Sequence, residues 1–202
     1  MEALRRELPR AWPALFRRFG RLTAIQVQGL APILAGRNVV LASATASGKT
    51  EAMVAPFAER ARPGAGLQLL WVVPTRALCN DLERRLAGPL SSLGLRLAVR
   101  TGDRPELRLR NPQDVVLTTP ESFDSLLCRV PALFREVRGV VLDELHQVDG
   151  TYRGDQLRIL LRRLERTLGR SPQYGALSAT LFDPEALARR YFPDPVVART
   201  RP

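Results

Sequence analysis

The residues best suited to chemistry stand at the end of segment 38–50, NVVLASATASGKT, where an apolar run gives way to small residues and then to Gly48, Lys49 and Thr50. These residue types, in this order, can bind phosphate. Small residues let backbone N–H groups close around an anion, and the following helix adds its positive end. A lysine reaches the terminal phosphates and a hydroxyl ligates Mg²⁺. The segment therefore predicts a cradle for the phosphates of ATP with Mg²⁺.

Lys49 is the only lysine in the chain, and every other basic residue is arginine. A compact ammonium must be needed there, because a planar guanidinium does not imitate it. The usual pattern has Gly where this chain has Ser43, and often also where it has Ala46, so we expect the cradle to form with both residues at negative φ. The alternative is an ordinary turn ahead of a helix. The predicted nucleotide-binding residues of this segment are Ser43, Ala44, Thr45, Ala46, Ser47, Gly48, Lys49 and Thr50.

Two adjacent acids, Asp143 and Glu144, end the most hydrophobic strand-like run, GVVLD. Burying two carboxylates is costly unless a cation or a reacting proton needs them. We expect Asp143, together with Thr50, to hold Mg²⁺, while Glu144 orients or deprotonates the attacking water. The alternative is a helix N-cap followed by a first-turn acid, which accounts for one carboxylate only.

Composition limits the class of protein. A chain of 202 residues with 45% hydrophobic residues can bury one full core. Its net charge of +11 favours a nucleic-acid partner, although a GC-rich genome or thermal adaptation could also enrich arginine. Cys79 and Cys128 lie in unrelated contexts, so we expect two buried free thiols and no zinc site. Without a long apolar run or a signal peptide, the chain is predicted to be soluble and cytoplasmic, with no membrane partner.

The pattern of apolar runs predicts a doubly wound α/β domain, with a mostly parallel sheet covered by helices on both faces. Residues 1–36 are expected to form N-terminal helices, with breaks at Pro9 and Pro13 and with Trp12, Phe16 and Phe19 among arginines, and to form one compact unit with residues 37–202. The expected strands are 38–42, 67–73, 95–99, 114–118, 139–143, 174–177 and 195–198. The expected helices are 23–36, 49–61, 76–87, 120–129, 153–168 and 184–191.

Polar sequences follow five of these strands directly: SATASGKT, PTRAL, TPES, DELH and SAT. Ligands of such sheets bind at the carboxyl ends of the strands, so all five sequences should share one edge of the molecule. This shared position is harder to dismiss than any of the short motifs alone.

Together these motifs resemble the first RecA-like domain of a superfamily 2 DExH helicase, a P-loop NTPase fold. The set comprises the cradle, the motif at 74–78, the Thr101–Gly102 pair, TTPES at 118–122, the DExH box at 143–146 and SAT at 178–180. NDLERRL at 80–86, VRTGD at 99–103 and Arg153–Gly154 after the box are most similar to Lhr-type and neighbouring Ski-like helicases. A DEAD-box protein would have Asp at the position of His146.

The resemblance implies further roles. Phe19 and Gln26 would contact adenine, although Gln26 could also be an exposed helix residue. The sugar-phosphate backbone would lie on Pro74, Thr75, Arg76, Thr101, Gly102, Thr119, Pro120 and Glu121. His146, which could also be a core histidine, would join Ser178, Ala179 and Thr180 in coupling the nucleotide to the nucleic acid. The implied catalytic set is Lys49, Asp143, Glu144 and His146.

The predicted function is the ATP-binding N-terminal domain of a 3′–5′ DNA helicase or translocase, Lhr-like and involved in DNA repair. Its expected partners are single-stranded DNA, or a duplex with a single-stranded tail, and a second RecA-like domain. This chain is expected to lack that second domain and therefore to be weak or inactive alone. The alternatives are an RNA helicase domain of the Ski-like kind and a non-catalytic nucleic-acid-binding module.

Overall fold

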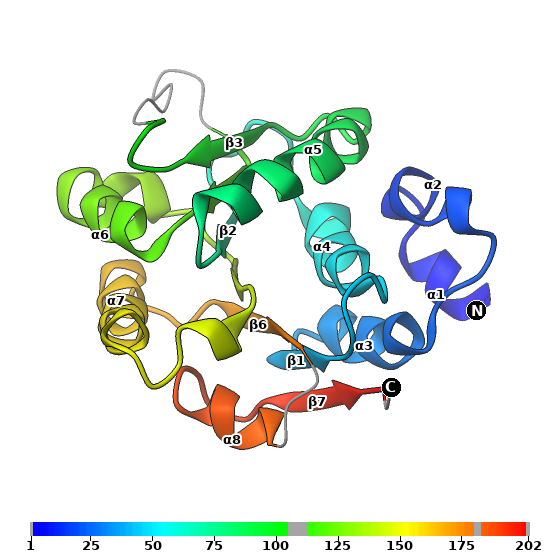
Figure 1. Ribbon diagram of the computed structural model, residues 1–202. Helices are drawn as coiled ribbons and strands as arrows, with labels where there is room; N and C mark the ends of the chain where they lie inside the picture. The colour runs from blue at the N-terminus through cyan, green and yellow to red at the C-terminus, as the bar shows by residue number, and fades with distance from the viewer. Residues whose placement is uncertain (1, 105–112, 180–182, 201–202) are drawn as a thin grey trace.

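In the computed structural model, which describes residues 2–104, 113–179 and 183–200, the chain forms a parallel sheet with helices on both faces (Figure 1). Within these ranges the sheet has seven strands in the order β3-β4-β2-β5-β6-β1-β7, and every neighbouring pair is parallel. The strands are β1 (Val39–Ala42), β2 (Leu69–Val72), β3 (Leu97–Arg100), β4 (Val115–Thr118), β5 (Gly139–Leu142), β6 (Gln173–Ser178) and β7 (Val196–Arg199). The predicted fold class and each of the predicted strands are confirmed.

The helices alternate with the strands along the chain. They are α1 (Glu2–Glu7), α2 (Ala11–Leu15), α3 (Ala24–Leu34), α4 (Lys49–Arg60), α5 (Arg76–Ser92), α6 (Pro120–Arg129), α7 (Tyr152–Leu168) and α8 (Pro184–Arg189). Short 3₁₀ turns are η1 (Arg17–Phe19), η2 (Pro131–Phe134) and η3 (Leu145–Gln147). Helix α5 runs five residues beyond its predicted end because Pro89 lies within it without ending it.

Two hydrophobic cores lie on opposite sides of the sheet. One packs α2 to α5 against alternate residues of the strands, including the fully buried Trp71 of β2. The other packs α6, α7 and α8 against the remaining strand residues, such as Leu70 and Val72. The central strands are buried on both faces, which is why their sequences are continuously apolar.

The N-terminal helices pack outside the α3 and α4 layer (Figure 1). Leu8 and Leu15 are buried in the core under them. The predicted break at Pro13 is wrong, because this residue lies inside α2. Pro13 is in the first turn of that helix, where the backbone N–H it lacks would have no helical partner anyway.

The helices and the two cysteines bear on what the composition predicted. None of the helices in the described ranges is long and apolar enough to cross a membrane. Of the two free cysteines, Cys79 is buried as expected but Cys128 is exposed. Cys128 lies near the end of α6, on the side that faces solvent, so its predicted burial is wrong.

Candidate nucleotide and nucleic-acid binding edge

The polar sequences that follow the strands meet at the carboxyl edge of the sheet, as predicted. Hydrogen bonds between parallel neighbours join the ends of the strands. At the ends of β1 and β6, the Ser43 N–H donates to the Ser178 carbonyl at 3.3 Å. On β5, the Asp143 N–H donates to the Val72 carbonyl at 2.8 Å. Parallel register alone thus places the cradle, the DELH box and the other motifs side by side.

The cradle is closed by its own side chains. The Lys49 ammonium, at the first position of α4, donates to the carbonyls of Ser43 and Ala44, the latter at 2.7 Å. The Ser43 and Ser47 hydroxyls are 2.5 Å apart. Lys49 is 7% exposed, and burial lowers its pKa while the nearby charges of Glu144 and Asp143 oppose that change. A buried ammonium held by carbonyls is positioned to exchange those carbonyls for phosphate oxygens.

One expectation for this loop is wrong. Ala46 has φ 58°, in the left-handed region, whereas Ser43 has no positive φ. A left-handed conformation costs a non-glycine residue about 1–2 kcal/mol. Gly48 also has a positive φ, 89°, so two left-handed residues curve the loop. The cradle therefore keeps its curvature by imposing on Ala46 the conformation that a glycine there would adopt freely.

The two acids of the DELH box occupy different environments in the same pocket as Lys49 and Thr50. The Trp71 indole N–H donates to one Asp143 oxygen at 3.1 Å, and the Glu144 backbone N–H donates to the other at 2.9 Å. Burial raises the pKa of Asp143 to about 6, and the Trp71 hydrogen bond opposes the rise. Glu144 has φ 45°, so it too is left-handed, and it makes no side-chain capping bond to η3. The pair therefore does not serve as a helix cap.

This donor set fits Mg²⁺. Hard cations prefer oxygen ligands, and the pocket that holds Lys49 offers the hydroxyl of Thr50 and the carboxylate of Asp143. A cation beside Asp143 would also offset the burial that now disfavours its charged form.

His146 contacts both the acids and the last motif. Its Nδ1 lies 3.4 Å from Glu144 Oε2, 3.2 Å from the Ser178 hydroxyl and 3.4 Å from the Ala179 backbone nitrogen. The imidazole is thus a half-buried link between β5 and β6, and the core-histidine alternative is not supported. Thr180, also predicted to couple the two sites, lies outside the described residues.

A cavity of ≈ 830 Å³ adjoins the cradle and is lined by Phe19, Gln26 and Gly48 among others. Gln26 is 3% exposed, so the alternative of an exposed helix residue is wrong. Its amide forms a capping box with Thr23 and donates to the Gly48 carbonyl at 3.2 Å. Thr23 Oγ1 donates to the Ser47 carbonyl at 2.8 Å. The segment predicted to contact adenine is therefore bonded directly to the cradle.

Arg85 of α5 was not singled out from the sequence. It lines both the cavity beside Phe19 and the pocket around Lys49. Its guanidinium lies 3.4 Å from Glu51 Oε1, and its side chain is 41% exposed against 6% for Glu51. A nucleotide spanning the two cavities would pass this guanidinium. Only the tertiary fold, which brings Arg85 of α5 to Glu51 of α4, places it here.

The predicted nucleic-acid residues fall into a buried and an exposed group. Thr101 and Thr119 are 1% and 6% exposed, and the Thr101 hydroxyl donates to Asp103 at 2.7 Å. Pro74 and Pro120 are also buried, whereas Thr75, Arg76, Gly102 and Glu121 face solvent. Arg76 Nε lies 3.5 Å from Asp103 Oδ1. Only the exposed members of this set are therefore accessible for direct contact with a nucleic acid.

Glu121 is engaged by a residue that was noted only for its family likeness. Arg153, at the start of α7, donates to both Glu121 oxygens, at 2.7 and 3.3 Å, and to the Pro74 carbonyl at 2.6 Å. Arg153 thereby ties the first turn of α6 to the loop after β2. A carboxylate does not attract phosphate, so this bridge is a physically better role for Glu121 than contact with a nucleic-acid backbone.

The geometry agrees with a family match. Residues 23–187 match the family model of DEAD/DEAH box helicases. The chain belongs to this helicase family. The resemblance to Lhr-type helicases is also confirmed, since the chain is 36% identical over 193 residues to the Lhr helicase/probable uracil glycosylase of Mycolicibacterium smegmatis, covering 85% of this chain and 13% of that protein. It is 34% identical over 157 residues to the ATP-dependent DNA helicase Hel308 of Pyrococcus abyssi, covering 77% and 21%.

A solved structure supports the same assignment. The Mycobacterium smegmatis helicase Lhr bound to ssDNA and AMP-PNP superposes with a TM-score of 0.81 at 32% identity, over 94% of this helicase-family chain and 27% of that chain. The RecA-like fold is thereby confirmed. The chain spans about an eighth to a quarter of the length of these three proteins.

Proposed function

We propose that this chain is the ATP–Mg²⁺-binding RecA-like domain of an ATP-dependent 3′–5′ DNA helicase or translocase that acts in DNA repair in the cytoplasm. The observation that carries the proposal is a single pocket in which Lys49 and Thr50 of the cradle face Asp143 and Glu144, next to the ≈ 830 Å³ cavity lined by Phe19 and Gln26. The ATP dependence in the names of its relatives supports the same ligand.

The residues have separable tasks in this proposal. Lys49 binds the terminal phosphates, and Thr50 and Asp143 hold Mg²⁺, which neutralises phosphate charge when bound. Glu144 orients the attacking water and accepts its proton, because it is the carboxylate beside the cradle that the Trp71 indole does not restrain. His146 links Glu144 to Ser178, so a change at the nucleotide can reach the strand-end loops.

The nucleic acid is proposed to lie along Thr75, Arg76 and Gly102, with backbone amides of the strand-end loops binding phosphates. Such contacts do not read base sequence. We propose DNA rather than RNA as the substrate because a relative, Hel308, is named a DNA helicase and the solved Lhr structure is bound to ssDNA. A second RecA-like domain in the complete protein would supply the charge that stabilises the transferred phosphoryl group.

The test is titration of the 202-residue polypeptide with AMP-PNP and Mg²⁺ by calorimetry. We expect a dissociation constant in the micromolar to millimolar range. ATP turnover should be well below the roughly 1–10³ s⁻¹ of ordinary enzymes, because these 202 residues form one RecA-like domain and the proposed site also needs charge from a second. Absence of nucleotide binding would favour the non-catalytic module. Brisk turnover stimulated by nucleic acid would contradict the need for a second domain.

A further inference from the structure

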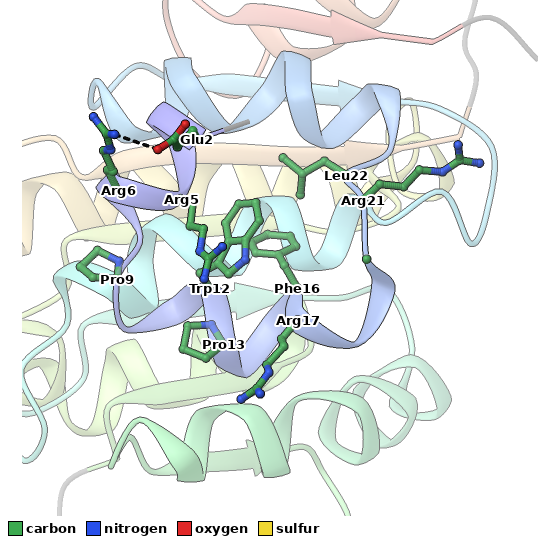
Figure 2. A pocket seen from close by; sticks show the side chains of 11 residues that line it. Glu2, Arg5, Arg6, Pro9, Trp12, Pro13, Phe16, Arg17, Arg21 and Leu22 are labelled. Atoms are coloured by element: carbon green, nitrogen blue, oxygen red, sulfur yellow. Dashed lines mark hydrogen bonds and ion pairs between the residues drawn. The ribbon is translucent and has the colours of Figure 1, made fainter.

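A further cavity is formed by the N-terminal helices, next to the cavity beside Phe19, with which it shares Arg21 and Leu22. It has a volume of ≈ 770 Å³ and is bounded by α1, α2 and the segment that leads to α3 (Figure 2). We call it the N-terminal groove; it is lined by Glu2, Arg5, Arg6, Pro9, Trp12, Pro13, Phe16, Arg17, Gly20, Arg21 and Leu22. None of the predicted functional residues lines it.

The groove carries an excess of positive charge. Four arginines line it against one acid, Glu2. Glu2 is paired with Arg6 at 2.8 Å, and both side chains are largely exposed. Among the described residues no carboxylate pairs with Arg5, Arg17 or Arg21, and all three are exposed. Exposed guanidinium groups without a protein counter-charge are suited to bind phosphates.

Two aromatic rings, those of Trp12 and Phe16, line the groove together with these arginines. Trp12 is half-buried and Phe16 is 3% exposed, and their ring centroids are 5.2 Å apart at an angle of 48°. Figure 2 shows the two rings side by side, with the Arg5 side chain overlapping Trp12 in this view and Arg17 pointing away below the rings. Phe16 packs against the Trp12 ring and holds it in place. A ligand that stacks on this ring therefore loses little free energy to ordering the side chain.

We propose that the N-terminal groove binds single-stranded nucleic acid independently of base sequence, with phosphates on Arg5 and Arg17 and a base stacked on Trp12. A guanidinium row interleaved with an aromatic face matches the alternation of phosphate and base along a strand. The volume falls within the roughly 300–1,000 Å³ of cavities that hold drug-sized ligands, which suits about one or two nucleotides. The class of partner rests on the proposed function, but the residues are different.

The charge part is tested with Arg5→Ala/Arg17→Ala in the 202-residue chain, using fluorescence anisotropy of a labelled oligothymidylate. Two lost phosphate contacts should reduce the slope of log K against log salt by about 1.4 and the affinity about 20-fold at 0.1 M salt. The matched control is Arg129→Ala/Arg166→Ala. These two arginines are also exposed, but they lie on α6 and α7 across the sheet. Equal losses in both double variants would overturn the groove.

The stacking part is tested by tryptophan fluorescence. Trp71 is fully buried, so quenching by an added strand reports on Trp12. We expect oligothymidylate to quench and an abasic strand of the same length to quench little and bind about five- to 150-fold more weakly. Equal binding by the abasic strand, or by polyglutamate of the same charge, would show a site for any polyanion and overturn the assignment.

Arg76→Ala separates this proposal from the function proposed above. If Arg76→Ala weakens binding and Arg5→Ala/Arg17→Ala does not, the strand-end track stands and the groove is rejected. If only the groove variant weakens binding, the groove stands and the track is wrong. Circular dichroism melting of each variant confirms that the fold is retained, and insensitivity of binding to both variants rejects the two sites together.

Discussion

Lys49 and Arg76 are cations at the same edge of one sheet, each at the first position of a helix, yet their surroundings differ. Lys49 is 7% exposed and bonded to two carbonyls of its own loop. The Arg76 side chain is 62% exposed and lies 3.5 Å from Asp103 in solvent. In the proposed nucleotide half of the edge, around Lys49, the charge is desolvated and bonded within the protein, whereas in the proposed nucleic-acid half, around Arg76, it is hydrated. The first half should tolerate substitution poorly and the second half well.

The largest effect is expected at Lys49. Lys49→Ala should weaken AMP-PNP binding about 100-fold, because it removes a charge-assisted hydrogen bond in a buried site, and should leave the fold intact. Glu144→Gln is the matched variant at the same pocket: it should bind the nucleotide normally, and in the complete protein it should stop hydrolysis. Calorimetry and single-turnover assays measure both. Equal loss of affinity in the two variants would mean that their roles are misassigned.

The pKa values of Asp143 and Asp103, one carboxyl group from each half, should be shifted in opposite directions. Burial raises the pKa of Asp143 to about 6, whereas the Thr101 hydroxyl bond holds the pKa of Asp103 below its usual value of 3.8. Asp143 therefore stabilises the nucleotide-free fold below pH 4 and loses that contribution as the pH rises towards 6. Asp103 contributes above its ordinary pKa and loses its contribution as the pH falls.

Carboxyl ¹³C NMR of the nucleotide-free chain checks this, with Asp143→Asn and Asp103→Asn assigning the two signals. Similar midpoints for both residues would remove the distinction between a desolvated and a hydrated half.

Arg85 tests the boundary between the halves, since it is partly exposed and lines both nucleotide cavities. Arg85→Ala should weaken AMP-PNP binding about tenfold if its guanidinium contacts the nucleotide. Arg84→Ala is the control, because the Arg84 side chain is 78% exposed and, although it also lies near Asp81, it lines neither of the two cavities. Identical affinities for the two variants would exclude Arg85 from the site.

A smaller effect is expected at Arg76, in the solvated half. Arg76→Ala should lower the affinity for single-stranded DNA about fivefold at 0.1 M salt and reduce the salt slope by about 0.7, the share of one phosphate. Arg166→Ala, on the outer helix α7, removes the same charge away from the edge. Anisotropy titrations at several salt concentrations compare them. If both variants lose the same affinity, the DNA is bound by general charge attraction and not by a specific path along Thr75, Arg76 and Gly102.

The smallest effect concerns the strained loop. Ala46→Gly should raise the free energy of unfolding by about 0.5 kcal/mol, since relief of about 1–2 kcal/mol of left-handed strain exceeds the added chain entropy of about 0.5–1 kcal/mol. Ala44→Gly, in the same loop but without a positive φ, should lower it by the entropy term alone. Urea unfolding measures the two. A loss of stability in both variants would mean that Ala46 is not strained.

Much of this site could be predicted from the sequence because its signals are local. Each apolar run of strand length proved to be a strand, and the residues directly after β1 and β5 proved to share a pocket. Parallel topology alone was sufficient to place them at one edge, because it brings every carboxyl end to the same side. The strained conformation of Ala46 was not predictable, because a small side chain is compatible with either sign of φ until the loop closes.

What the sequence by itself determined is the fold class and the order of the motifs, since these depend on residue type and spacing, and phosphate binding by Lys49 stays a prediction from the same signals. The tertiary structure alone decided which side chains restrain one another. Trp71 holds Asp143 across 72 positions of the chain, and Arg153 joins Glu121 to Pro74, the latter across 79 positions. Such partners have no spacing rule, because the distance along the chain between two packed elements is set by the elements that lie between them.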